Sequence, residues 1–246
     1  MQKLPRQLPP EKIIGPMQSD RRPQLIWDLP LRLWHWALVV CLAGSWITAE
    51  AGFDWTTTHF YFGYSALALV LFRLAWALLG TFHSRYATFL ASPKQVLAYL
   101  RRAKDAEPSA GHNPLGGWAS VVIVVLIGLQ ASTGLFISDD IFYAGPYNTV
   151  VSSSTADWLA GWHHRLFTLI QITVLMHVLA VSWYTWGKKE GLIQAMLHGK
   201  KTLQVRGAEE TVNEHRGLRA LLLLALAAAV VAIVVYVAPL PDYENY

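Results

Sequence analysis

The chain has 246 residues, of which 54% are hydrophobic and only 15% are Asp, Glu, Lys or Arg. With 11 Trp and 10 Tyr as well, this composition is too apolar for an ordinary soluble domain and indicates a membrane protein. The formal net charge of +4 does not indicate nucleic-acid binding, because the basic residues lie in the connections between apolar runs, where membrane topology favours them. The one cysteine, Cys41, lies within an apolar run, which excludes a disulfide framework, a cysteine-rich metal site and a Cys-x-x-Cys-His motif.

Residues 1–24 are polar, basic and interrupted by prolines, and no apolar run or small-residue cleavage site follows them directly. We therefore expect a cytoplasmic tail rather than a cleaved signal peptide. The first membrane span is expected at 31–49, where Asp28 and Pro30 suit a helix N-cap and first turn. It contains His35 between two tryptophans, a pattern typical of either an interfacial anchor or a ligand.

The second span is expected from His59 to Gly80. Gly63 follows His59 by one turn and leaves room for either a flat macrocycle or close helix packing. Arg73 lies fourteen residues after His59, so on a helix it shares the face of His59 about 21 Å deeper. The expected spans contain no Asp or Glu, so a cofactor propionate is favoured as the partner of Arg73 over snorkelling to the surface.

The next connection, 81–117, is basic, and Ser92-Pro93 introduces a short amphipathic helix expected on the membrane surface. His83 and His112 lie in this connection, and we expect both to be solvated. The third span, 118–137, has a small and polar side that includes Gly134 and suits packing against helices or a cofactor.

The fourth span, expected at 163–186, carries His163 and His177 fourteen residues apart. On a helix the two imidazoles share one face about 21 Å apart, so one helix offers ligands toward both sides of a hydrocarbon core about 30 Å thick. His164 lies about 100° around the helix from His163, which makes His163 the better ligand. The fifth span, 218–238, has no ligand and is expected to pack against lipid or a partner subunit.

The basic residues alternate between connections along the chain. Six Lys and Arg precede His35, five lie between the second and third spans, and seven lie from Lys188 to Arg219 inclusive, whereas the first and third connections and the C-terminal tail contain none. The positive-inside rule then predicts a cytoplasmic N-terminus and a periplasmic C-terminus. His59 and His163 fall toward the outer side and His35 and His177 toward the inner side.

Two histidine pairs at two depths favour two haems, which would be b-type because no motif for covalent attachment exists. Two axial histidines leave no open position at the iron, which favours electron transfer. Zinc would instead require its ligands to converge on one site, which the opposite depths forbid.

Several motifs together resemble the bacterial cytochrome b561 and nickel-hydrogenase cytochrome b family. They are Trp27-Asp28-Leu29-Pro30-Leu31-Arg32-Leu33-Trp34-His35-Trp36, His59-x-x-x-Gly63-Tyr64 with Arg73, His112-Asn113-Pro114-Leu115-Gly116, and His163 with His177. The resemblance spans 26–201 and implies a dihaem four-helix domain in the bacterial inner membrane, with His35, His59, His163 and His177 as ligands. It also implies electron exchange between the quinone pool and a partner redox protein.

The predicted fold is an all-α, integral membrane, four-helix haem-binding bundle with a fifth transmembrane helix. The expected organisation is a cytoplasmic tail at 1–24, the four-helix domain at 25–201, a cytoplasmic linker at 202–217, the fifth helix at 218–238 and a periplasmic tail at 239–246.

The expected function is an electron-transfer subunit of a quinone-linked oxidoreductase, rather than a stand-alone enzyme. It would contact membrane lipid and link quinone or quinol to a periplasmic cytochrome c, dehydrogenase or hydrogenase. The extra helix and the long tail go beyond the four-helix pattern and suggest membership of a larger complex. Two alternatives remain: a self-sufficient membrane oxidoreductase passing electrons between superoxide and quinone, and a haem-free membrane protein with a proton path.

Overall fold

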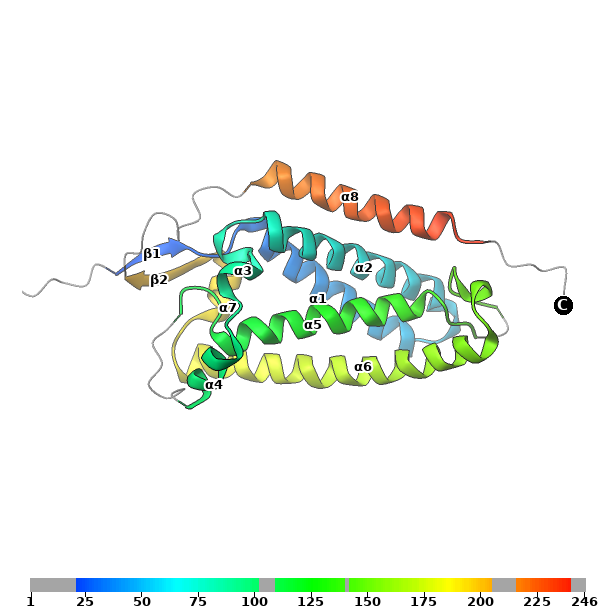
Figure 1. Ribbon diagram of the computed structural model, residues 1–246, viewed down its shortest axis with the longest axis horizontal. Helices are drawn as coiled ribbons and strands as arrows, with labels where there is room; N and C mark the ends of the chain where they lie inside the picture. The colour runs from blue at the N-terminus through cyan, green and yellow to red at the C-terminus, as the bar shows by residue number, and fades with distance from the viewer. Residues whose placement is uncertain (1–20, 102–108, 140–141, 205–215, 240–246) are drawn as a thin grey trace, which may run out of the picture.

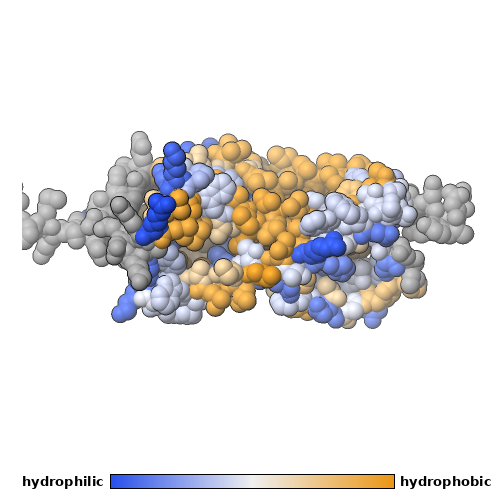
Figure 2. Space-filling view, turned by 60° about the horizontal axis from the view of Figure 1, so that its bottom comes forward, coloured by the Kyte–Doolittle hydropathy of each residue, from blue (hydrophilic) through white to orange (hydrophobic). Residues whose placement is uncertain are grey.

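Five long helices dominate the computed structural model, which describes residues 21–101, 109–139, 142–204 and 216–239 (Figure 1). They are α1 Leu29–Glu50, α2 Thr56–Leu79, α5 Pro114–Gly134, α6 Ser153–Ser182 and α8 Gly217–Tyr236. Each of these helices is long and apolar enough to cross a membrane. Apolar side chains gather along the middle of the face drawn in Figure 2. The expected all-α membrane bundle is confirmed.

The short α-helices and the two strands gather at one end of the bundle, which we call the sheet end; the opposite end is the far end (Figure 1). They are α3 Tyr86–Phe89, α4 Pro93–Arg101, α7 Leu192–His198 and the strands β1 Arg21–Leu25 and β2 Lys200–Gln204. Helix α4 is the amphipathic helix expected from the sequence. Its start is a capping box, in which Ser92 N–H donates to Gln95 Oε1 and Gln95 N–H donates to Ser92 Oγ.

The two strands correct the expected tail and linker. They pair antiparallel, from Arg21 opposite Gln204 to Leu25 opposite Lys200, so residues 21–24 belong to a sheet rather than to the tail, and the expected linker begins inside a strand. Residues 1–20 and 205–215 lie outside the described part of the chain. The sequence did not predict this pairing, because the strands are far apart in the chain and no hairpin turn joins them.

Helix starts follow capping residues rather than the edges of apolar runs. The side chains of Asp28, Asn113 and Ser152 accept from backbone N–H groups at the starts of α1, α5 and α6. Helix α6 therefore begins at Ser153, ten residues before the expected start at His163. The expected start was too late because the first turns of α6 are polar and do not extend the apolar run. Helices α1, α2, α5 and α8 agree with the expected spans to within about four residues.

The middle of the bundle is filled by one buried apolar cluster. It receives side chains from four helices: Leu38, Cys41, Ala66, Leu69, Val70, Val124, Ile127 and Ile170. Helix α1 packs on α2, α2 on α5, and α5 on α6. Helices α1 and α6 close the bundle mainly through side chains, including the ring contact of Trp46 with Phe167 at 5.9 Å. The cluster separates the sheet end of the bundle interior from the far end.

Helix α8 packs along α2 and so belongs to the same bundle. Ala220, Ala227 and Val231 of α8 are buried, whereas its other face is exposed, as expected for lipid contact. The guanidinium groups of Arg216 and Arg219 donate to the carbonyl oxygen of Leu79 at the end of α2. At the far end, Tyr147 Oη–H donates to the carbonyl oxygen of Val234, at 2.6 Å. Helix α8 is thus tethered to the bundle at both ends.

Candidate functional site

At the far end, His59 of α2 and His163 of α6 face each other, with their ring centroids 6.4 Å apart. Each imidazole is fixed by a hydrogen bond at its Nδ1 atom. His59 Nδ1 lies 2.9 Å from the carbonyl oxygen of Ser45, and His163 Nδ1 lies 3.0 Å from Thr133 Oγ1. The Thr133 hydroxyl donates to the carbonyl oxygen of Gln130, so its oxygen accepts from His163 Nδ1–H. This network assigns the proton to Nδ1 and leaves Nε2 of both rings available to a metal.

The space around this pair suits a flat cofactor. The Nε2 atoms of His59 and His163 would hold a metal between the two rings, and an imidazole nitrogen lies about 2 Å from the metal that it binds. No heavy atom lies within 4 Å of the position that a Cβ atom would take at Gly63, and a Cβ atom at Gly134 would lie 3.2 Å from His163 Cε1. Gly63 thus borders open space and Gly134 lies against the His163 ring, where a larger residue would push the imidazole.

At the sheet end, the structure brings His35, Arg73 and His177 to similar depths. His35 lies six residues after the start of α1, Arg73 lies six residues before the end of α2, and His177 lies five residues before the end of α6. His35 Nδ1 is buried with no hydrogen-bond partner among the described residues, and His177 is exposed. An orphaned buried nitrogen and an uncovered imidazole both suit ligation by a group placed between α1 and α6.

Arg73 is only 3% exposed, and protein groups surround its guanidinium. Nη1 donates to the carbonyl oxygen of Ser84 at 3.0 Å, and the guanidinium carbon lies 4.6 Å from the Tyr86 ring centroid and 5.5 Å from that of Trp34. Within the described residues Arg73 forms no ion pair, so its predicted propionate partner stays a prediction. The burial of Arg73 shows that it does not snorkel to the surface.

Sequence reasoning missed the wider role of Asp28, which it treated only as a helix cap. Its side chain is 0% exposed. Besides Leu31 N–H, it accepts hydrogen bonds from Trp76 Nε1, Thr81 Oγ1 and Ser84 Oγ. The available signal was the position of Asp28 directly before an apolar span, but its additional partners lie about fifty residues away.

His83 and His112 were expected to be solvated, and the structure contradicts this. His83 is 7% exposed, and the ring of His112 packs against those of Phe89, at 4.4 Å, and Trp27, at 4.8 Å. Burial, followed by the nearby charge of Arg73, lowers the pKa of His112 to about 3. The connection that carries these histidines folds back over the sheet end of the bundle, which its polar composition did not indicate.

The histidines form pairs rather than larger clusters. Among the described residues, no group of three or more His, Cys, Asp or Glu side chains could hold a metal ion. Zinc requires about four converging ligands, whereas a haem requires two opposed ones. The paired arrangement therefore suits a haem.

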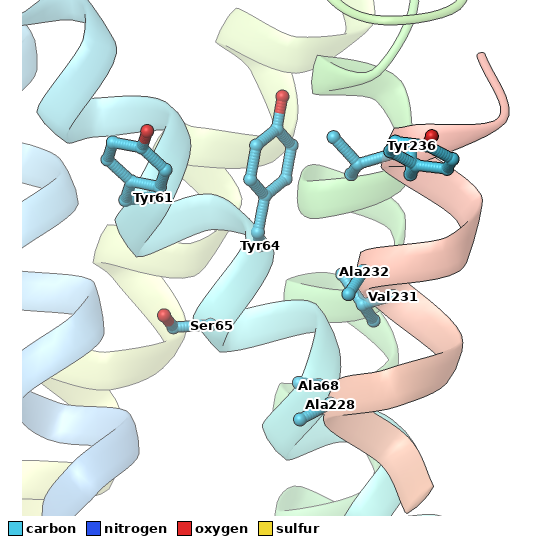
Figure 3. Close-up of a pocket in the computed structure, with 9 residues that line it drawn as sticks. Tyr61, Tyr64, Ser65, Ala68, Ala228, Val231, Ala232 and Tyr236 are labelled. Carbon is cyan, nitrogen blue, oxygen red and sulfur yellow. The ribbon is translucent and has the colours of Figure 1, made fainter.

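A separate hollow of about 450 Å³ lies between α2 and α8 (Figure 3). Its walls are formed mostly by small and apolar side chains, and Tyr61, Tyr64 and Tyr236 lie toward the far end. Tyrosines at this level are typical of a membrane interface. The hollow contains none of the predicted ligands.

A bundle of long apolar helices that carries histidine pairs toward both of its ends is typical of the class of membrane cytochromes. Comparison with known families agrees: the family model described as prokaryotic cytochrome b561 matches residues 26–199, well over half of the chain. The protein belongs to this family and is a b-type cytochrome that transfers electrons in a membrane, with haem b as its cofactor.

Similar curated proteins carry related names. The chain is 24% identical to the probable Ni/Fe-hydrogenase 1 B-type cytochrome subunit of Escherichia coli (strain K12), over 72% of this chain and 90% of that protein. It is 29% identical to the probable Ni/Fe-hydrogenase B-type cytochrome subunit of Azotobacter vinelandii, over 65% of this chain and 74% of that protein. No solved structure matches the chain.

Proposed function

We propose that the protein carries electrons across the bacterial inner membrane, between the quinone pool and a periplasmic redox partner, through two haems b. His59 and His163 hold the haem at the far end, and His35 and His177 hold the one at the sheet end. Held by two histidines, each haem would supply a one-electron redox centre with no open position for a substrate, which suits electron transfer.

The geometry of His59 and His163 carries this proposal. Ligating histidines almost always give their other ring N–H to a carbonyl, carboxylate or water, which fixes the tautomer and the ring orientation. The Ser45 carbonyl and the Thr133 hydroxyl provide such acceptors for this pair. Two opposed imidazoles with both Nδ1 atoms anchored are prepared for ligation by Nε2.

The part of the bundle between the two histidine pairs separates them and excludes water. His163 and His177 are fourteen residues apart on one helix, a separation of about 21 Å. The apolar cluster around Ile127 and Ile170 fills the intervening space, so water is excluded and a fixed low-dielectric medium separates the centres. Arg73 places a buried positive charge at about the depth of the sheet-end pair, where it favours anionic groups such as propionates.

The names of similar proteins support the proposed redox partner, and the distribution of basic residues supports the proposed orientation in the membrane. The relatives are named as subunits of Ni/Fe-hydrogenases, which supports assembly with a redox enzyme. The basic connections of the chain come together at the sheet end, which we assign to the cytoplasm by the positive-inside rule. The far end then faces the periplasm, where its acidic connections would favour a basic redox partner.

Optical spectra with pyridine-haem quantitation on the purified protein test this proposal. We expect two low-spin b haems per chain. His163→Ala should lose the far-end haem and His177→Ala the sheet-end haem, so that each variant keeps one. His164→Ala is the matched control, because His164 is an exposed neighbour on the same helix, and it should keep both haems.

A colourless protein, or a haem content insensitive to both substitutions, would contradict the dihaem proposal. Copurification of a redox enzyme would support the complex. Reduction of quinone by superoxide at high rate without any partner would instead support the self-sufficient oxidoreductase.

A further inference from the structure

A buried carboxylate lies at the sheet end, beyond the histidines and Arg73 of the proposed function. Asp28 is 0% exposed, and its two carboxylate oxygens accept hydrogen bonds from different groups. Oδ1 accepts from Leu31 N–H at 2.7 Å, which caps α1. Oδ2 accepts from Trp76 Nε1 at 3.2 Å, Thr81 Oγ1 at 2.5 Å and Ser84 Oγ at 2.6 Å, which lie on α2 and in the turn after it.

Capping explains only half of this arrangement. A serine or asparagine would cap α1 about as well as an aspartate, and a cap at a membrane surface does not need to be buried. Burial of a carboxylate is costly unless it is paired and fully hydrogen-bonded. Three donors on one oxygen indicate that the negative charge itself is accommodated at this position.

Ser84 joins this carboxylate to Arg73. Its hydroxyl donates to Asp28 Oδ2, and its carbonyl oxygen accepts from Arg73 Nη1 at 3.0 Å. Arg73 is 3% exposed and has no ion-pair partner within the described residues. The two buried groups therefore have opposite charges and share one residue as a bridge.

We propose that Asp28 is the counter-charge of Arg73 and a positioning residue for the sheet-end haem, an inference that rests on the proposed function. Through Ser84 it fixes the guanidinium at the sheet end, at about the depth of His35 and His177, and it balances the positive charge that Arg73 places at that depth. A negative charge near a redox centre stabilises its oxidised form, and a positive charge stabilises its reduced form. Asp28 and Arg73 thus hold the potential of this haem between the values that either charge alone would produce.

Redox titration of the full-length protein, followed by its optical spectrum, tests the inference with a charge-swap series. Asp28→Asn keeps the cap and removes the charge, and should raise the midpoint potential of the sheet-end haem. Arg73→Gln should lower it. The double variant Asp28→Asn/Arg73→Gln should return it close to the wild-type value, and the far-end haem should keep its potential throughout.

Thr81→Val is the matched control, because it removes one hydrogen bond to the same oxygen without changing any charge. It should leave both potentials at their wild-type values. A shift in Thr81→Val as large as that in Asp28→Asn would overturn the proposal, because hydrogen bonding rather than charge would then set the potential. An unshifted potential in Asp28→Asn, or additive shifts without compensation in the double variant, would also overturn it.

Folding is a second readout if a single variant does not accumulate. Removing the charge of Asp28 alone leaves the buried charge of Arg73 without this counter-charge, whereas the double variant removes both charges. Recovery of folded, haem-containing protein in the double variant would support the pairing, and its absence would overturn it. The proposed function fails separately, since its failure would appear as unaltered haem content in His177→Ala, a variant that retains both charges.

Discussion

Thr133 shows how one residue controls a ligand that belongs to another helix. It lies near the end of α5, and its hydroxyl accepts from Nδ1–H of His163 on α6 while donating to the carbonyl oxygen of Gln130. The hydroxyl therefore selects the His163 tautomer in which Nε2 is free. Gly134, the next residue, removes the Cβ atom that would push the His163 ring from this position.

Thr133→Val should weaken haem binding at the far end, because His163 Nδ1–H loses its acceptor at almost unchanged side-chain volume. Loss of a hydrogen bond behind a ligating histidine typically costs about 10- to 100-fold in affinity. The rate of haem loss to an excess of a haem-scavenging protein, measured by absorbance, checks this. Thr168→Val is the control, because the exposed Thr168 hydroxyl bonds only to the carbonyl oxygen of His164 on its own helix. Equal haem loss in the two variants would contradict the prediction.

The surroundings of a single side chain could be predicted from the sequence only where the spacing along one helix determines them. The fourteen-residue interval from His163 to His177 places both side chains on one face of any straight helix. The environment of His112 had no such local cause, because Trp27 and Phe89 reach it from other parts of the chain. Its low pKa, about 3, therefore followed only from the folded structure.

At the scale of elements, α8 shows that sequence reasoning can identify a helix without identifying its neighbour. Its apolar run of Leu, Ala and Val suits lipid on every side, and packing against lipid or a partner was the expectation. The structure buries Ala220, Ala227 and Val231 of α8 and exposes its larger leucines. Small residues let two helix backbones approach closely, which explains why this face lies on α2.

Removing the two guanidinium tethers should loosen α8. The guanidinium groups of Arg216 and Arg219 donate hydrogen bonds to backbone carbonyl oxygens at the C-terminal end of α2. Positive charge at this end is also favoured by the helix dipole. In an Arg216→Ala/Arg219→Ala variant, we expect faster maleimide labelling of a cysteine introduced as Ala227→Cys, in a Cys41→Ala background. A cysteine introduced as Leu222→Cys is the control, because Leu222 is already exposed. An unchanged labelling rate at position 227 would contradict the prediction, because apolar packing and the Tyr147 hydrogen bond would then hold the helix without the two guanidinium groups.

At the scale of the whole molecule, the charge distribution predicts orientation. The connections that gather at the sheet end are basic, and those at the far end contain acidic residues and no Lys or Arg. A fluorescent protein fused after His198 should fluoresce, because fluorescent proteins fold in the cytoplasm. Alkaline phosphatase fused after Val237 should be active, because alkaline phosphatase requires the periplasm. The reverse pattern at both positions would invert the proposed topology and move the His59 and His163 pair to the cytoplasmic side.

The sequence by itself determined the class of fold, the number of spans, the face shared by His163 and His177, and the depths of His35 and His59. These features depend on composition and helical period, which are local properties of the chain. Sequence alone placed the start of α6 too late, because a polar cap rather than an apolar run begins the helix.

Only the tertiary structure decided which groups meet across helices. The Thr133 hydroxyl behind His163, the Asp28 carboxylate bridged to Arg73 through Ser84, the burial of His112, and the pairing of β1 with β2 all join residues that are distant in the chain. The physical reason is that each of these contacts depends on the relative position and rotation of two elements, which packing sets and which no periodicity within one element encodes.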